Sequence, residues 1–173
     1  MDRREDKGVQ EQEHGLKAAV ITVSDRSFRG EREDKSGTVL SAILSENGYE
    51  ITEELLLPDE EDRIAEELVR LCDEKGPDVI FTTGGTGFSN RDRTPEATLR
   101  VAERNAPGIA EALRAESAKY TPNAMLSRGA SVIRGKTIII NLPGSPKAVR
   151  EGLEFLLPRL FHGIMILRGE ADG

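Results

Sequence analysis

The chain has 173 residues, of which 37% are hydrophobic, and its 24 Lys and Arg against 31 Asp and Glu give a formal net charge of −7. That length is typical of one domain that buries a core without disulfides or a structural metal, and the single cysteine, Cys72, cannot form an internal disulfide. The acidity argues against general nucleic-acid binding, and there is neither a run of about 20 apolar residues nor an apolar N-terminal core. We therefore expect a cytoplasmic protein that has no nucleic-acid or membrane partner.

The first elements expected along the chain are a tail, a strand, a helix and a second strand. Residues 1–15 are charged, rich in Gln and without periodicity, which predicts a disordered tail. Residues 17–23 are almost continuously apolar, as in a strand that is covered on both faces. Residues 34–47 place apolar side chains on one helical face, and residues 49–57 predict the second strand.

The middle of the chain predicts two helices separated by a third strand. A proline and a run of acidic residues after the second strand indicate a helix that continues to residue 75. Residues 78–83 predict a buried strand that runs directly into a glycine-rich turn. The next helix begins near Thr94, which we expect to be its N-cap, with Pro95 at the first helical position.

The C-terminal third predicts a helix, a hairpin and a closing helix. Residues 107–119 are helical in pattern, and residues 130–133 and 137–141 flank a polar turn, which predicts a hairpin. Residues 148–157 then begin the closing helix.

Strands that alternate with helices predict an α/β fold. We expect three layers, with a mostly parallel sheet, helices on both faces and a short antiparallel hairpin at one edge. The folded domain is expected over residues 16–168, followed by a C-terminal tail over residues 169–173. In such sheets ligands bind outside the carboxyl ends of the strands. The loops after residues 23, 83 and 141 all lie at predicted strand ends, so their unusual side chains should gather along one edge.

Charge is unevenly distributed along the chain. Between Glu50 and Asp78 there are 12 acidic and 3 basic residues, whereas between Arg91 and Arg150 there are 11 basic and 5 acidic residues. The second stretch is where an anionic ligand is expected. The alternative is that most of these charges only solvate helix faces.

The strongest local signal is a glycine-rich turn followed by an acidic residue. Residues 82–87, Thr-Thr-Gly-Gly-Thr-Gly, can turn sharply and present amides to a phosphate, although a purely structural turn explains the glycines equally well. Asp92 lies between Arg91 and Arg93 just before a helix, an arrangement that can hold a phosphorylated ligand and a divalent cation. Mg²⁺ usually takes one or two protein carboxylates. Asp59, at another strand end, is the natural second carboxylate, unless it caps the helix that follows.

Together these motifs resemble the MogA/MoaB family and the equivalent domain of gephyrin and the plant Cnx proteins. The resemblance covers about residues 16–167. The motifs are, in order, Ser24-Asp25-Arg26, Asp34-Lys-Ser-Gly37, Pro58-Asp59, Thr83-Gly-Gly-Thr-Gly87, Arg91-Asp92-x-Thr94-Pro95-Glu96-Ala97, Leu126-Ser-Arg128 and Asn141-Leu-Pro-Gly-Ser-Pro146. Family members with the full set are molybdopterin adenylyltransferases. The resemblance therefore implies a role in molybdenum cofactor biosynthesis, by transfer of AMP from Mg²⁺-ATP to the terminal phosphate of molybdopterin with release of pyrophosphate.

The resemblance also implies residue roles and partners. Asp59 and Asp92 match the two catalytic aspartates, which we expect to be the Mg²⁺ ligands. The expected nucleotide and phosphate site comprises Thr83, Gly84, Gly85, Thr86, Gly87 and Thr94. The expected pterin and phosphate site comprises Ser24, Asp25, Ser127, Arg128, Pro143, Gly144 and Ser145. From charge alone, we expect Arg128 and Lys147, the basic residues nearest two of these motifs, to attract the anionic pterin. The alternative is that Arg128 caps or pairs within a helix end and that Lys147 is a solvated first-turn residue. The resemblance further implies a homo-oligomer, a trimer or sometimes a hexamer, and a molybdenum-insertion protein as a candidate partner.

Two other interpretations remain at this point. The first is a non-catalytic molybdopterin-binding or carrier protein of the MoaB branch, some members of which lack the aspartate after the second strand. The presence of both Asp59 and Asp92 favours catalysis. The second is a different nucleotide enzyme on the same fold, as in the CinA family, and the motifs around Arg128 and Asn141 weigh against it.

The histidines and two of the methionines indicate no further chemistry. His14 and His162 have no metal-ligand partner at useful spacing, so surface or packing roles are expected. Met125 and Met165 lie among apolar residues and are expected to fill the core.

Overall fold

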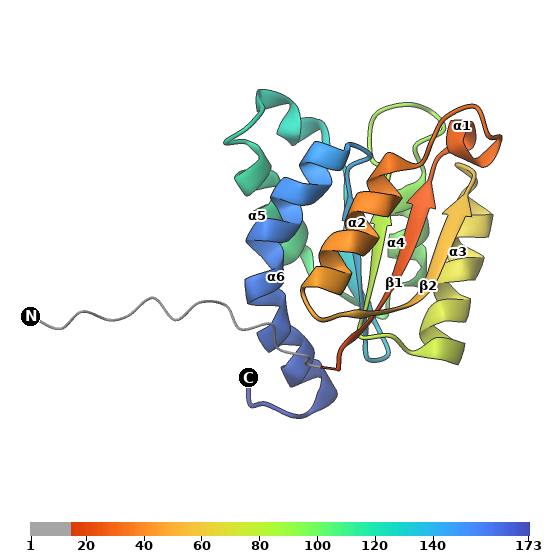
Figure 1. Cartoon of the computed structure of the whole chain (residues 1–173). Helices are drawn as coiled ribbons and strands as arrows, with labels where there is room; N and C mark the ends of the chain where they lie inside the picture. Colours follow the sequence, from red (N-terminus) through yellow and green to blue (C-terminus); the bar gives the residue numbers. More distant parts are fainter. Residues whose placement is uncertain (1–14) are drawn as a thin grey trace, which may run out of the picture.

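One six-stranded sheet organises the part of the chain that the structure describes, residues 15–173 of a computed structural model (Figure 1). The strands are β1 (Lys17–Val23), β2 (Glu50–Leu57), β3 (Val79–Thr83), β4 (Arg104–Asn105), β5 (Ser131–Arg134) and β6 (Thr137–Leu142). They lie in the order β2-β1-β3-β6-β5-β4, and the first four of that order are parallel to one another. β5 pairs antiparallel with both β6 and β4. The predicted mostly parallel sheet with an antiparallel edge hairpin is confirmed.

Helices cover both faces of the sheet, as the alternation of elements predicts. They are α1 (Asp25–Phe28), α2 (Lys35–Glu46), α3 (Glu61–Arg70), α4 (Thr94–Val101), α5 (Pro107–Ser117) and α6 (Pro146–Arg168), with a π-helical turn η1 (Leu71–Lys75) and a 3-10 turn η2 (Pro122–Leu126). One core packs α2, α5 and α6 against the sheet, and the other packs α3 and α4 against its opposite face. Figure 1 shows α2 and α6 in front of the sheet and α3 behind it.

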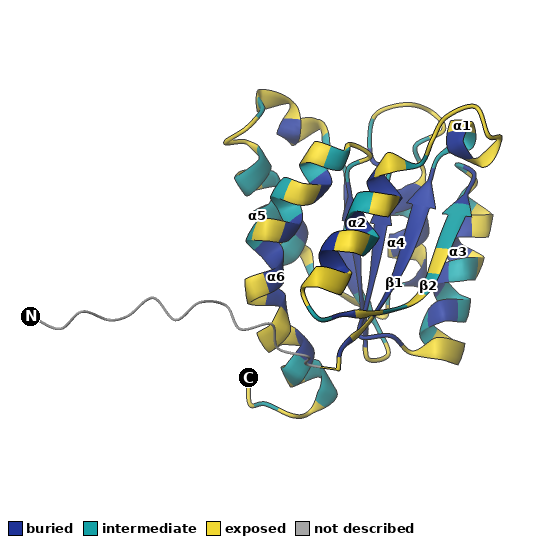
Figure 2. Cartoon of the chain, in the orientation of Figure 1, coloured by how far each residue is buried: buried dark blue, intermediate teal, exposed yellow. Residues whose placement is uncertain are grey.

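Burial explains why the central strands are continuously apolar. β3 and β6 are buried throughout, and β1 is buried after its first residue, because each has helices on both faces. β2 lies at an edge and alternates between exposed and partly buried residues until its end, where Leu57 is buried. Figure 2 shows this difference between the central strands and β2. No helix in the described part of the chain is long and apolar enough to cross a membrane.

Several local predictions are wrong. Thr94 is the first residue of α4 and not its N-cap, because its buried hydroxyl donates to the carbonyl of Gly84 (3.0 Å). The polar loop expected after β1 opens with the single helical turn α1, which is capped by the Ser24 hydroxyl. β4 was not predicted, since two residues carry no periodicity. Met125 is 78% exposed, because it lies on the surface turn η2 and not in the core.

Two boundary predictions fall at the ends of the chain. The expected tail over residues 1–15 lies outside the described residues except for Gly15. The closing helix α6 is longer than the stretch 148–157 and continues through Pro158 to Arg168, where Gly169 ends it in the left-handed conformation.

The strand order places a crevice between β1 and β3. From β1 the chain passes through α2 to β2 on one side, and from β2 it crosses to β3 on the other side of β1. The connection after β1 leads to one face of the sheet, while the connection after β3 leads through α4 to the other. Diverging connections of this kind leave room for a ligand outside the carboxyl ends of the two strands.

Candidate functional site

A polar cavity of about 510 Å³ lies at this crevice. The ends of β1 and β3 and the start of α2 form its walls, and two carboxylates from other loops complete it. Its lining includes Thr22, Val23, Ser24, Ser27, Arg32, Glu33, Asp34, Lys35, Ser36, Asp59, Thr83, Gly84, Gly85, Asp92, Gly144 and Pro146. The structure therefore brings together the two predicted aspartates and the first half of the glycine turn.

A second, mainly apolar cavity of about 290 Å³ adjoins the first. It lies among α5, α6 and η2, and its lining includes the predicted residues Thr86, Gly87, Ser127 and Pro143. Because Gly85 lines the polar cavity and Thr86 the apolar cavity, the two lie side by side along one loop. A ligand with a polar part and an apolar ring could occupy both cavities.

The glycine turn has its shape because of contacts within the protein. Gly84 and Gly85 have positive φ (93° and 70°), which other residues rarely adopt. A Cβ atom at Gly84 would lie 2.3 Å from the carbonyl oxygen of Val23, and one at Gly85 would lie 2.2 Å from Thr94 Oγ1. The structural explanation of these two glycines is therefore sufficient, and the backbone that they allow forms the wall of the polar cavity.

Two threonines hold the glycine turn, Thr83 in the lining of the polar cavity and Thr94 outside it. The Thr83 hydroxyl donates to the carbonyl of Pro143 (2.7 Å), and the Thr94 hydroxyl donates to Gly84. Both side chains are fully buried. Their contacts fix the turn, whose residues Gly84 and Gly85 line the polar cavity.

Arg128 holds the second half of the same loop. Its Nε donates to the carbonyl of Gly87 (2.8 Å), one terminal nitrogen donates to the carbonyl of Asp92 (2.7 Å), and the other pairs with Glu96. All three guanidinium nitrogens are engaged by protein oxygens. The structure therefore gives Arg128 a bracing role, and its charge is largely balanced by Glu96.

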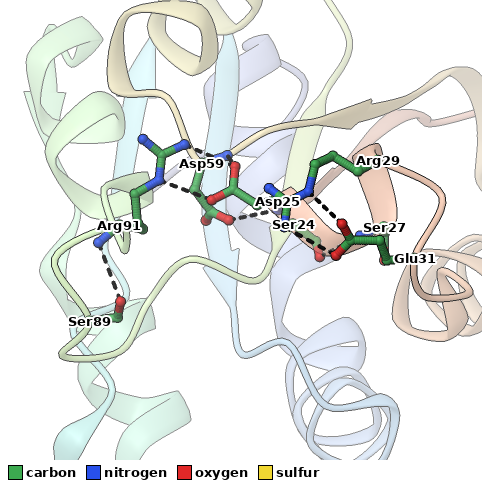
Figure 3. A network of polar contacts seen from close by, with 8 residues as sticks. All are labelled: Ser24, Asp25, Ser27, Arg29, Glu31, Asp59, Ser89 and Arg91. Carbon is green, nitrogen blue, oxygen red and sulfur yellow. Dashed lines mark hydrogen bonds and ion pairs between the residues drawn. The ribbon is translucent and has the colours of Figure 1, made fainter.

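Asp25 and Asp59 are joined by two reciprocal hydrogen bonds (Figure 3). The Asp59 amide donates to Asp25 Oδ1 (2.9 Å), and the Asp25 amide donates to Asp59 Oδ2 (2.8 Å). Arg91 grips the Asp25 carboxylate with two nitrogens, Nε at 2.9 Å and Nη2 at 3.0 Å. These contacts join the loops after β1, β2 and β3.

The network has opposite effects on its two carboxyl groups. Hydrogen bonding to Arg91 lowers the pKa of Asp25 below its usual value, so Asp25 is ionised at neutral pH. Burial raises the pKa of Asp59, and the negative charges of Asp25 and Asp92 raise it further. A positive charge bound beside Asp59 would offset that repulsion.

The two cavity aspartates suit Mg²⁺ only together with other oxygens. Asp92 Oδ2 accepts from the amide of Ser89 (2.9 Å), and Asp59 Oδ2 accepts from Asp25. Within the described residues, the second oxygen of each carboxylate accepts no hydrogen bond. No group of three or more metal-ligating side chains occurs in that part of the chain. A pair of carboxylates beside an open cavity fits a cation that takes its remaining ligands from water and phosphate.

The remaining predicted residues lie at or beside the cavities. Ser24 and Ser145 act as N-caps, accepting from the amides of Ser27 (3.1 Å) and Ala148 (3.4 Å). A Cβ at Gly144 would lie 3.4 Å from Gly84 Cα, so this residue packs against the glycine turn. Asp25, Thr94, Arg128 and Ser145 do not line either of the two cavities described above. Lys147 is 83% exposed and lies 3.9 Å from Glu151.

Several cavity residues were not predicted. In the polar cavity they include Lys35 and Ser36 at the start of α2, where the Asp34 carboxylate caps the Gly37 amide (2.9 Å). In the apolar cavity they include Arg114 and Glu151. The motif Asp34-Lys-Ser-Gly37 was a signal for the first group, whereas charged residues on a helix carry no comparable signal for the second.

Comparisons with known proteins agree with this geometry. A family model described as a probable molybdopterin binding domain matches residues 19–162. A molybdopterin adenylyltransferase of Helicobacter pylori (strain J99) is 44% identical over 153 residues, which are 87% of this chain and 86% of that protein. The enzyme of the same name from Escherichia coli (strain K12) is 42% identical over 142 residues, 80% of this chain and 72% of that protein.

A solved structure agrees with both matches. The crystal structure of the molybdopterin biosynthesis enzyme MoaB from Thermus thermophilus superposes with a TM-score of 0.84 at 44% identity, covering 89% of this chain and 97% of that one. The matched residues include the glycine turn and both cavity aspartates. The chain belongs to the molybdopterin-binding family of MogA and MoaB.

Proposed function

We propose that this protein is a molybdopterin adenylyltransferase of molybdenum cofactor biosynthesis. The observation that carries the proposal is the pair of adjoining cavities, a polar one with two carboxylates and an apolar one, which share the glycine turn. Relatives more than 40% identical over most of the chain are named for this activity. ATP and molybdopterin are the substrates, with the triphosphate in the polar cavity and the pterin in the apolar cavity.

The reaction requires placement of charges more than a protein nucleophile. An oxygen of the pterin's terminal phosphate forms a bond to the α-phosphorus of ATP, and the bond from that phosphorus to the bridging oxygen breaks as pyrophosphate leaves. Asp59 and Asp92 would hold Mg²⁺, which when bound neutralises the phosphate charge. The backbone N–H groups at the start of α2 and the Lys35 ammonium would face the remaining phosphates.

The lining of the apolar cavity offers a pterin both apolar walls and a hydrogen-bond acceptor. Its walls include Leu113, Leu126 and Leu142, against which a flat ring can pack. Glu151 is only 16% exposed, lines the same cavity and has Lys147 as a distant partner at 3.9 Å. The amino-pyrimidine edge of a pterin carries two neighbouring N–H donors, and a carboxylate can accept both. We assign Glu151 this orienting contact.

Self-association is also part of the proposal. Phe88 and Met125 are 71% and 78% exposed, and Leu99 and Tyr120 are also exposed. Exposed apolar side chains mark a contact between proteins where they form one contiguous patch. The family resemblance implies a homo-oligomer, and on that ground we propose a trimer of the chain.

The test of the proposed function is pyrophosphate release from purified protein. Release should require ATP, Mg²⁺ and molybdopterin together, and should be absent when any one is omitted. Pterin binding without pyrophosphate would instead identify a carrier. Release from ATP and Mg²⁺ without pterin would identify a different nucleotide enzyme.

A further inference from the structure

Arg91 contacts a loop far from its own position in the sequence. It follows the glycine turn and precedes Asp92. Its guanidinium nevertheless donates two hydrogen bonds, of 2.9 and 3.0 Å, to the carboxylate of Asp25, which is 66 residues away in the sequence. The contact is bidentate, the geometry in which arginine binds a carboxylate most specifically. Arg91 therefore ties the loop that carries Asp92 to the loop after β1 (Figure 3).

Both oxygens of the Asp25 carboxylate accept hydrogen bonds from the protein. Oδ2 accepts from Arg91, and Oδ1 accepts from both Arg91 and the Asp59 amide (2.9 Å). Asp25 does not line the polar cavity either. These contacts leave it poorly placed to bind a substrate, although the sequence motif suggested a pterin contact.

The hydrogen bonds that hold Asp59 in place come mainly from Asp25. It lies between the end of β2 and the start of α3, and Glu60, not Asp59, occupies the N-cap position. The Asp25 carboxylate fixes the Asp59 backbone, and the Asp25 amide fixes Asp59 Oδ2 at 2.8 Å. The other oxygen of Asp59 is left for a ligand.

The balance of charges in the network also leaves Asp59 and Asp92 available for a cation. Asp25, Asp59 and Asp92 bring three negative charges to neighbouring loops, and the Arg91 guanidinium balances the one that is not in the cavity. Two carboxylates then remain for a divalent cation. Because Arg91 and Asp92 are adjacent, the same contact also sets where the second cavity carboxylate lies relative to the first.

We propose that Arg91 and Asp25 are positioning residues that act as a unit to hold Asp59 and Asp92 at the separation that binds Mg²⁺-ATP. The inference rests on the proposed function, because it needs the two aspartates to be the cation site. It assigns Asp25 a role through Asp59 instead of a contact with pterin. It also gives Arg91 a role in Mg²⁺-ATP binding.

Calorimetric titration with Mg²⁺-ATP in the absence of pterin tests the proposal. Arg91→Gln and Asp25→Asn should each weaken Mg²⁺-ATP binding about 10-fold or more, within the range seen when charge-assisted contacts are lost. The melting temperature should change by only about 3 °C or less, because the Arg91 side chain is 58% exposed and the amide side chain of Asp25→Asn keeps an oxygen that can accept from the Asp59 amide. Arg91→Lys should recover part of the affinity, because it keeps the charge but loses the bidentate geometry.

Arg93→Gln is the matched control. Arg93 belongs to the same loop and is 46% exposed, against 58% for Arg91, but its partner is Glu61 (2.8 Å), outside the polar cavity. This variant should bind Mg²⁺-ATP like the wild type. In turnover, Arg91→Gln should raise the KM for Mg²⁺ more than it lowers kcat, a split that general loosening of the fold would not produce.

The double variant distinguishes a unit from two separate effects. Arg91→Gln with Asp25→Asn should bind within about 3-fold of the weaker single variant, because each single change already breaks the unit. Losses that multiply would overturn the proposal. So would unchanged Mg²⁺-ATP affinity in both single variants.

Asp59→Asn measured in parallel separates this inference from the proposed function. If Asp59→Asn weakens Mg²⁺-ATP binding and the Arg91 and Asp25 variants do not, only the positioning role is refuted. If Asp59→Asn itself leaves the affinity unchanged, the cation site of the proposed function is wrong, and the positioning role is refuted with it.

Discussion

Replacing Gly85 with alanine tests whether the glycine turn is required by the fold. Gly85 has φ +70°, and a Cβ there would lie 2.2 Å from Thr94 Oγ1, far inside contact distance. The left-handed conformation costs about 1 to 2 kcal/mol for a residue with a Cβ. The Thr94 side chain is fully buried, so it has to give up its hydrogen bond to Gly84 in order to move.

The expected loss of stability follows from these two terms. A buried carbonyl left without its partner costs about 1 to 3 kcal/mol, so the two terms together give about 2 to 5 kcal/mol. For a domain of 150 to 250 residues, each kcal/mol lowers the melting temperature by about 2 to 4 °C. Gly85→Ala should therefore melt about 4 to 20 °C below the wild type.

Circular dichroism melts of Gly85→Ala and Gly163→Ala provide the assay. Gly163 lies inside α6, has no positive φ and has open space where a Cβ would lie. The Gly163→Ala protein should gain about 0.5 to 1 kcal/mol, because alanine favours a helix. A Gly85→Ala protein that melts with the wild type and has lost only ATP affinity would refute the reasoning, and would show that the glycine makes room for ligand alone.

Two further predictions concern single carboxylates. Burial and the neighbouring charges raise the pKa of Asp59 in the folded protein above its ordinary value of 3.8. Ionisation of Asp59 is therefore less favourable in the folded than in the unfolded protein, and the folded state loses stability as the pH rises through the raised pKa. Asp59→Asn should therefore be more stable than the wild type in chemical denaturation at pH 7, with a gap that closes as pH falls toward 4, and a gap that widens on acidification would contradict the assignment. Glu151→Gln should reduce affinity for a 2-amino-4-oxopteridine about 10-fold or more while hardly changing affinity for the 2,4-dioxo analogue, because only the first offers the paired N–H donors. The exposed neighbour Glu154→Gln is the control, and equal losses for both pteridines in Glu151→Gln would remove the proposed orienting contact.

The central strands were predictable because burial dictates their composition. The nearly continuous apolar runs at residues 17–23 and 78–83 are typical of short strands that are covered on both faces, and each ends in a polar or glycine-rich loop. Topology then requires those loops to share an edge. The polar cavity lies at that edge, with Asp59 and Asp92 both in its lining.

The contacts that join distant loops were not predictable from the sequence. The pairing of Asp25 with Arg91 spans 66 residues, and nothing in either motif indicates it. Thr94 has the residue type expected of an N-cap, but its buried hydroxyl donates to the Gly84 carbonyl and accepts from no amide of α4. Glu151 lies on a helix whose spacing looks like that of any solvated face, and only the packing of α5 against α6 encloses it.

The most direct measurement is the conversion of molybdopterin to its adenylylated form, followed by mass spectrometry together with pyrophosphate release. The wild-type protein should form the product with Mg²⁺-ATP. Asp59→Asn and Asp92→Asn should remain folded and lose about 10²- to 10³-fold in rate, as expected when a preorganised charge is removed. Product formation at near wild-type rates in both variants, or no product from the wild type while pterin still binds, would contradict the account.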